Sequence, residues 1–173
     1  RQMTPDTGMQ SDMGADYDNE VVSRALAETI DEIYERTGKK AIVVTHSQGG
    51  AAGWTAARYT DNIGAIVAIE PGGAPSTDSD EFKAIVEKNI PVTFYYGDYI
   101  DNGDADIQAT GMWQAMRQTA YDFADAIEKE GGNASVVDLP KEGIEGNTHF
   151  MFQDKNSDEI AAHIEDWLKE NVK

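Results

Sequence analysis

The chain has 173 residues, 40% of them hydrophobic, and a formal net charge of -18 at pH 7. A chain of this length can bury a sizeable core within one domain. The acidic excess argues against nucleic acid and anionic membrane surfaces as partners, because both need clustered Lys and Arg. The absence of cysteine excludes disulfides, zinc–thiolate sites and thiol catalysis. No stretch of the sequence is apolar and long enough to predict a membrane span.

Residues 1–17 are polar and lack periodicity, so we expect a loop or an arm there. A helix is expected next, because apolar residues recur at helical spacing from Val21 to Tyr34, with Asp18 or Asp16 as its cap and Gly38 as its end. Further strands are predicted at 41–44, 65–69, 92–96 and 134–139, and further helices at 48–59, 80–88, 111–129 and 157–172. Gly, Pro, Asp and Asn predict loops at 71–79, 97–108 and 140–149.

This alternation of short strands and helices predicts an α/β fold. Strands that alternate with helices need right-handed crossover connections, which give a parallel sheet with helices on both faces, here of about four strands. Chemistry in such sheets gathers at the carboxyl ends of the strands. Ser47, Glu70 and Asp98 directly follow three predicted strands, and His149 lies in the loop beyond the fourth. We therefore expect a nucleophile, two candidate acids and a base at one edge of the sheet.

The segment Ala-Ile-Val-Val-Thr-His-Ser-Gln-Gly-Gly, residues 41–50, gives the strongest functional signal. A turn from strand to serine to helix strains the serine backbone and displays its hydroxyl, so Thr45 and Gly49, two positions from Ser47, need to be small. The backbone N–H of Gln48, at the helix start, would face negative charge that develops during acyl transfer. Thr45 departs from the usual G-x-S-x-G pattern, and the alternative interpretation is a simple tight turn.

The chemistry of ester cleavage assigns roles to these residues. The Ser47 hydroxyl is a weak nucleophile at neutral pH and needs a base within hydrogen-bond reach. His149 suits that role because an imidazole titrates near neutrality. A carboxylate would fix the ring tautomer and stabilise the imidazolium. The residues alone leave that carboxylate open between Glu70 and Asp98, with Asp101 as a weaker rival, although an Asp in Asp98's position also commonly holds turn backbone.

Several ordered motifs resemble the α/β-hydrolase superfamily, and in particular bacterial esterases whose triad acid is a Glu followed by Pro. The matching segments are Arg1–Gly8, Thr45–Gly49, Ala65–Gly73, Tyr95–Tyr99 and Gly146–Phe150. The resemblance covers essentially the whole chain. It implies a triad of Ser47, Glu70 and His149 that hydrolyses a small-molecule ester through an acyl-enzyme, without a cofactor.

The family's sheet usually has eight strands, and this chain matches the last four. The resemblance therefore implies that residues 1–173 form a single unit, the C-terminal part of an α/β-hydrolase catalytic domain. The first half would hold the loop that supplies a second oxyanion donor. An open sheet edge beside the nucleophile strand is costly to leave unpaired. We expect missing residues, another chain or a second copy to supply the N-terminal half.

The remaining histidines, Trp113 and the acidic Asp98–Asp106 segment are expected to be structural, to line the pocket or to lie on the surface. His46 is expected to be structural or to line the pocket, and Trp113 to be buried against the sheet or, alternatively, to line an acyl pocket. His163 is expected to be a partly exposed surface residue. No histidine pair has metal-ligand spacing, so no metal site is predicted. The Asp98–Asp106 segment lacks the distal Glu of a calcium loop and is expected to be solvated.

The sequence is compatible with two classes of function. One is a serine hydrolase, and the other is a catalytically incomplete hydrolase half that acts as a binding or assembly module. A flavodoxin-like binding domain shares the alternating pattern, but the His46–Gly49 turn is a poor phosphate-cradling loop. The sequence leaves the substrate's acyl and alcohol groups open. It also leaves localisation open, with secretion or the periplasm preferred over the cytoplasm.

Overall fold

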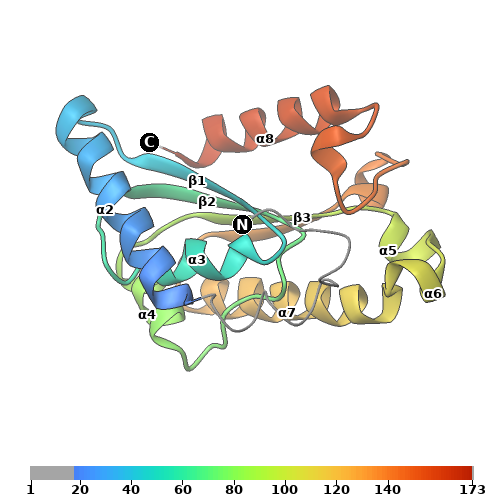
Figure 1. Ribbon diagram of the computed structural model, residues 1–173, viewed down its shortest axis with the longest axis horizontal. Helices are drawn as coiled ribbons and strands as arrows, with labels where there is room; N and C mark the ends of the chain where they lie inside the picture. Colours follow the sequence, from blue (N-terminus) through green and yellow to red (C-terminus); the bar gives the residue numbers. More distant parts are fainter. Residues whose placement is uncertain (1–17, 173) are drawn as a thin grey trace, which may run out of the picture.

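The computed structural model describes residues 18–172, except the side chains of residues 107 and 108, and the expected arm at residues 1–17 lies outside this region. One sheet runs through the described region with helices packed around it (Figure 1). In chain order the elements are α2 (Asn19–Thr37), β1 (Ala41–His46), α3 (Gly49–Ala56), β2 (Ile63–Ile69), α4 (Asp80–Glu87), β3 (Val92–Tyr96), α5 (Tyr99–Asn102), α6 (Ala105–Gln108), α7 (Thr110–Lys129), β4 (Ala134–Asp138) and α8 (Ser157–Asn171), with 3₁₀ turns at Leu139–Glu142 and Met151–Gln153.

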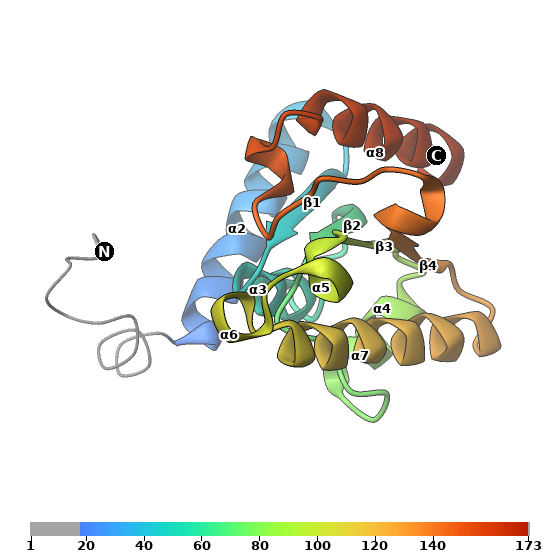
Figure 2. The ribbon, with the colours of Figure 1, turned by 90° about the vertical axis from the view of Figure 1, so that its right-hand side faces the viewer.

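The four strands lie in the order β1-β2-β3-β4, and each neighbouring pair is parallel. Ile66 of β2, for example, lies opposite Val43 of β1 on one side and Val92 of β3 on the other. The carboxyl ends of all four strands therefore meet at the same edge of the sheet. Figure 2 is seen from the end of the molecule where α5 and α6, which follow the carboxyl end of β3, lie. The predicted α/β class with a parallel sheet of four strands is confirmed.

The helices cover the sheet unequally. α3, α4 and α7 lie on one face and α8 lies on the other (Figures 1 and 2). Side chains of β2 alternate accordingly: Ile66 and Ala68 belong to the core on the three-helix face, whereas Val67 and Ile69 belong to the core under α8. This strand is buried on both faces, as its continuous apolar sequence predicts. Burial of each such aliphatic side chain contributes at most about 1.5–3 kcal/mol.

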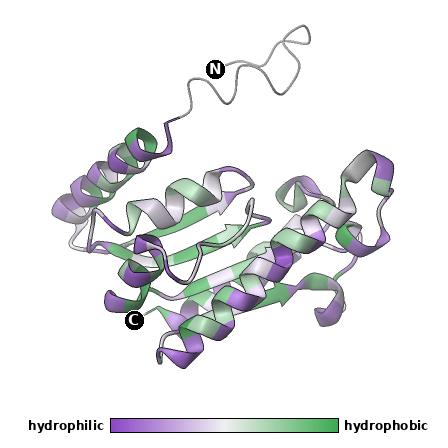
Figure 3. Ribbon diagram, turned by 90° about the horizontal axis from the view of Figure 1, so that it is seen from below, coloured by the Kyte–Doolittle hydropathy of each residue, from purple (hydrophilic) through white to green (hydrophobic). Residues whose placement is uncertain are grey.

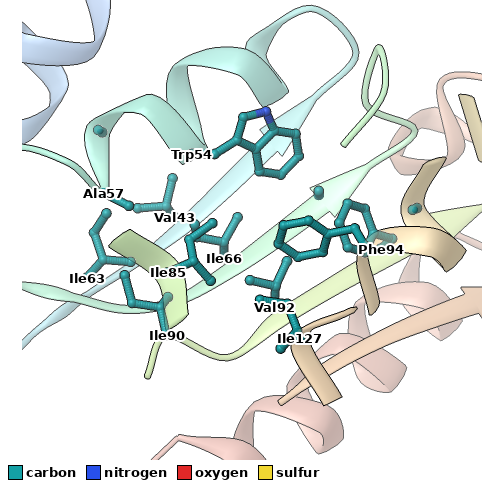
Figure 4. Close-up of a cluster of buried hydrophobic side chains, with 14 of the residues drawn as sticks. Val43, Trp54, Ala57, Ile63, Ile66, Ile85, Ile90, Val92, Phe94 and Ile127 are labelled. Atoms are coloured by element: carbon teal, nitrogen blue, oxygen red, sulfur yellow. The ribbon is translucent and has the colours of Figure 1, made fainter. Parts of the chain in front are cut away.

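Aromatic side chains fill the larger core, which lies between the sheet and the helices α3, α4 and α7 (Figure 4). The Trp54 ring of α3 lies 5.9 Å from Phe94 of β3, and Phe94 meets Phe123 of α7 edge to face at 5.6 Å. Such tilted and edge-to-face pairs suit the charge distribution of the rings. In Figure 3 the strands are mainly hydrophobic, whereas hydrophilic residues are frequent along α2 and α7.

Helix α2 packs beside β1 at one margin of the sheet (Figure 2). The Asp18 side chain accepts hydrogen bonds from the backbone N–H groups of Glu20 and Val21, and Gly38 ends the helix with φ 67°. Both caps agree with the sequence prediction, since Asp satisfies free N–H groups and Gly adopts the left-handed conformation without strain. None of the helices in residues 18–172 is apolar and long enough to cross a membrane.

The segment predicted as a loop at residues 97–108 instead contains the one-turn helices α5 and α6. Asp104 caps α6 by accepting a hydrogen bond from the N–H of Asp106, and the N–H of Gly103 closes α5 on the carbonyl of Tyr99. Asp, Asn and Gly predict turns from composition, but the same side chains also stabilise isolated helical turns through local hydrogen bonds. The other predicted helices and strands are present, with ends that differ by a few residues.

Candidate active site

Ser47 occupies the turn between β1 and α3 with φ 54°, in the left-handed region. Its N–H donates to the carbonyl of Ile69 at 3.1 Å, and its own carbonyl accepts from the N–H groups of Gly50 and Gly72, both at 3.1 Å. A non-glycine residue in this region is strained, and it persists only where the surroundings hold it. The backbone on both sides of the turn therefore fixes Ser47 in the conformation that a displayed nucleophile needs.

The steric need for small residues differs from the expectation. A Cβ atom added at Gly49 would meet no heavy atom of the described residues within 4 Å. An added Cβ at Gly53 would lie 2.8 Å from Thr45 Cγ2, and one at Gly50 would lie 2.8 Å from the side chains of Pro71 and Trp54. Close packing of α3 against β1 and the segment after β2 makes glycine necessary at these later positions.

Gln48 is exposed at the N-terminus of α3. Within residues 18–172, its backbone N–H donates to no carbonyl, which is the normal condition of the first groups of a helix. The helix dipole adds partial positive charge at the same place. An oxyanion beside Ser47 would find a donor here.

Glu70 directly follows β2, is fully buried with 0% of its surface exposed, and has φ 39°. Three donors surround its carboxylate. The backbone N–H of Gly97 donates to Oε1 at 2.8 Å, while His149 Nδ1 and the Tyr99 hydroxyl donate to Oε2 at 2.7 Å and 2.6 Å. A buried carboxylate is costly unless it is hydrogen-bonded, and these donors supply that compensation. The structure thus brings Glu70 and His149 into direct contact.

The ring of His149 lies between two other rings. Trp113 of α7 is 4.3 Å away between ring centroids and His46 of β1 is 4.4 Å away. His46 Nε2 also donates to the backbone carbonyl of His149 at 2.8 Å. Burial lowers the pKa of His46, although the hydrogen bond to His149 opposes this effect. These contacts fix both the ring and the backbone of His149.

The rival acids lie in other hydrogen-bond networks. Asp98 accepts from the N–H groups of Gly146 and Asn147, at 3.1 Å and 2.6 Å, and so holds the loop that leads to His149. Asp101 pairs with Arg117 through two hydrogen bonds of 2.8 Å and 2.9 Å, which lower the pKa of its carboxyl. The carboxylate that contacts His149 in this structure is that of Glu70.

A cavity of about 440 Å³ adjoins Ser47. Its wall is largely apolar and consists of Ser47, Gln48, Ala51, Trp54, Gly72, Gly73, Ala74, Pro75, Trp113 and Met116. Trp113 therefore contacts both the cavity and the His149 ring, whereas His46 lies outside the cavity wall. Among the described residues no hydrogen bond joins Ser47 Oγ to His149, and such bonds commonly tighten only when substrate is bound.

A larger hollow, of about 920 Å³, lies at the opposite end of the sheet, near the amino ends of the strands. Its wall includes Lys39, Lys40 and Lys88 but none of the candidate catalytic residues. Ligands of open α/β sheets bind at the carboxyl ends of the strands, so we place the candidate site at Ser47 despite the smaller volume.

Two residues gain contacts that the sequence did not indicate. Tyr99 belongs to the Tyr95–Tyr99 motif that carries the resemblance, but nothing in the sequence assigned it a contact with Glu70. His163 is partly exposed, as expected, and its Nδ1 also lies 3.0 Å from the hydroxyl of Tyr95. Within residues 18–172, no cluster of His, Asp and Glu is arranged to hold a metal ion.

Comparison with known proteins found no matching family model. The chain is 24% identical over 172 residues to "Probable secreted lipase phiG" from Fungal sp. (strain ATCC 74256), a match that covers 75% of this chain and 46% of the relative. It also matches the structure described as "The Atomic Resolution Structure of a Novel Bacterial Esterase", with a TM-score of 0.73 and 28% identity over 87% of this chain and 43% of that chain. These findings confirm the resemblance to α/β-hydrolase-like esterases. The chain spans less than half the length of both proteins.

Proposed function

We propose that this chain carries the catalytic residues of a serine ester hydrolase. Ser47 is the nucleophile, His149 the base and Glu70 the acid. The observation that carries the proposal is the buried Glu70–His149 hydrogen bond, 2.7 Å long, at the same edge of the sheet as a strained Ser47. Backbone strain at both Ser47 and Glu70 adds support, since such strain clusters at functional sites.

In this mechanism His149 takes the proton of the Ser47 hydroxyl as its oxygen attacks the ester carbonyl carbon. Because Nδ1 is bonded to Glu70, the ring presents Nε2 to the nucleophile. Glu70 stabilises the imidazolium that forms. The N–H of Gln48 donates to the oxyanion of the tetrahedral intermediate, where a fixed donor in a partly dry site stabilises the developing charge.

The second half of the reaction uses the same groups in reverse. The intermediate collapses, the bond to the alcohol oxygen breaks, and His149 gives its proton to the departing alcohol. His149 then removes a proton from water, whose oxygen attacks the acyl group on Ser47. The second tetrahedral intermediate then collapses, the bond between Ser47 Oγ and the acyl carbon breaks, His149 returns its proton to Oγ, and the acid product leaves.

The cavity indicates an uncharged substrate. Trp54, Trp113 and Met116 are the largest side chains in the cavity wall, and no Lys, Arg, Asp or Glu belongs to the described part of that wall. An apolar acyl or alcohol group gains free energy by leaving water here, whereas a charged group would find no partner. We therefore propose a small-molecule ester with an apolar group. The relative is named as secreted, and we propose secretion for this chain also.

The second candidate is an assembly module that is incomplete without further strands. β1 hydrogen-bonds β2 on one side, and its other side faces no strand among the described residues. Val44 of β1 is 57% exposed and Val21 of the adjacent α2 is 61% exposed. Because an open apolar edge invites pairing, we propose that the chain is the C-terminal part of a catalytic domain. Further strands beside β1 would complete the sheet and supply the second oxyanion donor.

Labelling with a fluorophosphonate probe, followed by peptide mapping, tests the first candidate. An activated Ser47 attacks the phosphorus, so the label should map to Ser47 in the unaltered chain and disappear in Ser47→Ala. Ser76→Ala is the control, because Ser76 is an exposed loop serine whose hydroxyl bonds the carboxylate of Asp78. Its labelling should equal that of the unaltered chain.

Absence of labelling in folded protein would reject independent nucleophile activation in this chain and favour the assembly module. The mass in solution, measured by light scattering on the same sample, then separates the two forms of that candidate. A dimer would point to a second copy as the source of the missing strands. A stable monomer without labelling would point to a different chain or to a further part of this one.

A further inference from the structure

Tyr99 makes a contact that the triad alone does not require. It is the first residue of α5 and only 6% exposed, and its hydroxyl lies 2.6 Å from Glu70 Oε2. His149 Nδ1 donates to this same oxygen at 2.7 Å. Two donors thus share one carboxylate oxygen, and the Tyr99 hydroxyl also lies 3.5 Å from Nδ1 itself.

The backbone ties Tyr99 to the loop that carries the histidine. The N–H of Tyr99 donates to the carbonyl of Asn147 at 3.3 Å, and the preceding Asp98 accepts from Asn147 at 2.6 Å. These bonds fix the phenol relative to His149. Burial and the hydrogen bond to Glu70 raise the pKa of Tyr99, so the phenol stays protonated and remains a donor throughout the working pH range.

Among the described residues, the polar side chains next to His149 Nδ1 are those of Tyr99 and Glu70. Glu70 contributes the negative charge and His46 presents its ring at 4.4 Å. Trp113 and Phe150 pack against the imidazole without charge, at 4.3 Å and 5.2 Å. No Lys or Arg within residues 18–172 forms an ion pair with Glu70. The two neutral donors, Tyr99 and the N–H of Gly97, therefore disperse the charge of this carboxylate.

We infer that Tyr99 is a positioning residue that sets the basicity of His149 by competing for Glu70 Oε2. A donor on the carboxylate draws electron density away from the oxygen that the imidazole contacts. The neutral imidazole loses less from this than the imidazolium does, because the imidazolium depends more strongly on the carboxylate charge. Tyr99 thereby weakens the stabilisation that Glu70 gives to the imidazolium relative to the neutral ring.

Tyr99→Phe removes the hydroxyl and keeps the ring. The inference rests on the proposed function for its kinetic arm. There the acid limb of the pH dependence of kcat/KM should move about half a pH unit higher. Above this limb kcat should not fall and KM should change little, because the fuller carboxylate charge of Glu70 stabilises the imidazolium that forms in the transition state. A merely structural role for Tyr99 would lower the amount of folded protein without moving the limb.

Tyr95→Phe is the matched control. Tyr95 is also buried, and its hydroxyl bonds a different histidine, His163 at 3.0 Å, under α8. Its backbone carbonyl accepts from the N–H of Glu70 at 3.0 Å, a bond that Tyr95→Phe leaves in place. Its removal should leave the acid limb in place. A ring-fluorinated tyrosine at position 99 is a stronger donor, so it should move the limb in the opposite direction, to lower pH, and it tests the inference even if Tyr99→Phe folds poorly.

NMR titration of the His149 ring protons provides a readout that needs no catalysis. The ring should titrate at higher pH in Tyr99→Phe, and at its original pH in Tyr95→Phe. An unchanged titration in folded Tyr99→Phe would overturn the inference, whether or not the chain hydrolyses esters. A moved titration in a chain that fluorophosphonate does not label would support the Tyr99 inference and reject the proposed hydrolase.

Discussion

Two carboxylate clusters near the carboxyl ends of the strands differ in the groups that compensate their negative charge. In the Glu70 cluster, formed by Glu70, His149, Tyr99 and Gly97, a buried carboxylate is held by neutral donors and a histidine. In the Arg117 cluster, formed by Arg117, Asp101, Asp138 and Lys141, two carboxylates are held by permanent cations. The Arg117 guanidinium bonds both aspartates, and Lys141 adds a second cation on Asp138.

The difference shows which acid is available to a histidine. When a carboxylate is paired with Arg, its charge is already compensated and its oxygen lone pairs already accept hydrogen bonds from the guanidinium. Asp101 therefore stabilises α5 against α7, whereas Glu70 keeps its charge for His149. Position after a strand is common to Glu70 and Asp98, and only the identity of their partners separates the two.

The largest expected effect is the loss of activity in Glu70→Gln. The amide cannot stabilise the imidazolium and can hold the wrong tautomer, so kcat or the rate of fluorophosphonate labelling at Ser47 should fall about 10³–10⁴-fold. Asp101→Asn, in the other cluster, should change either rate less than about threefold, because only a partly exposed ion pair is lost. A larger loss in Asp101→Asn than in Glu70→Gln would reverse the assignment of the acid.

A smaller effect, on stability and not on catalysis, is expected for Arg117→Met. Asp138 is 4% exposed and would keep only Lys141 and the Tyr121 hydroxyl as partners. Removal of one partner from a buried pair leaves an under-compensated charge, so we expect a loss of about 2–3 kcal/mol in the free energy of unfolding, measured with urea. Asp101→Asn should cost under about 1 kcal/mol. Equal stability of Arg117→Met and the unaltered chain would show that the cluster is not stabilising.

The smallest effect is a dependence of stability on pH that differs between His46, which packs against the Glu70 cluster, and the Arg117 cluster. Burial lowers the pKa of His46, next to His149, below its ordinary value of 6.5. The unfolded chain then binds a proton first, so this stability is fully present above pH 6.5 and is lost as pH falls through the folded pKa. Because the ring is partly exposed, we expect roughly half a kcal/mol.

His46→Gln should abolish that near-neutral component in urea titrations at a series of pH values. The Arg117 cluster loses its stability in a more acidic window, because Arg117 lowers the pKa of Asp101 below its ordinary 3.8. That stability is present above pH 3.8 and is lost as pH falls through the folded value. A near-neutral component that persists in His46→Gln would assign it to another group.

The sequence alone was sufficient for the order of the strands and longer helices, for the parallel sheet, and for the positions of Ser47 and Glu70 after their strands and of His149 in the loop beyond β4. The reason is that these features depend on local periodicity and on the rule that parallel strands share their carboxyl edge. The apolar runs of β1, β2 and β3 each predict a strand buried on both faces, which is confirmed for β2 and β3 but wrong for β1, where Ile42 and Val44 are exposed. The prediction of a loop from local composition was wrong at α5 and α6, because Asp and Gly there stabilise single helical turns.

The tertiary structure decided which carboxylate meets His149 and what else meets that carboxylate. Glu70 and Asp98 are equivalent by sequence position, with Asp101 three residues further on, and only folding brings Gly146 to Asp98 and Arg117 to Asp101. The Tyr99 hydroxyl reaches Glu70 across 29 residues, and His149 reaches it across 79. Contacts at such separation depend on the packing of whole elements, so no local pattern of residues determines them.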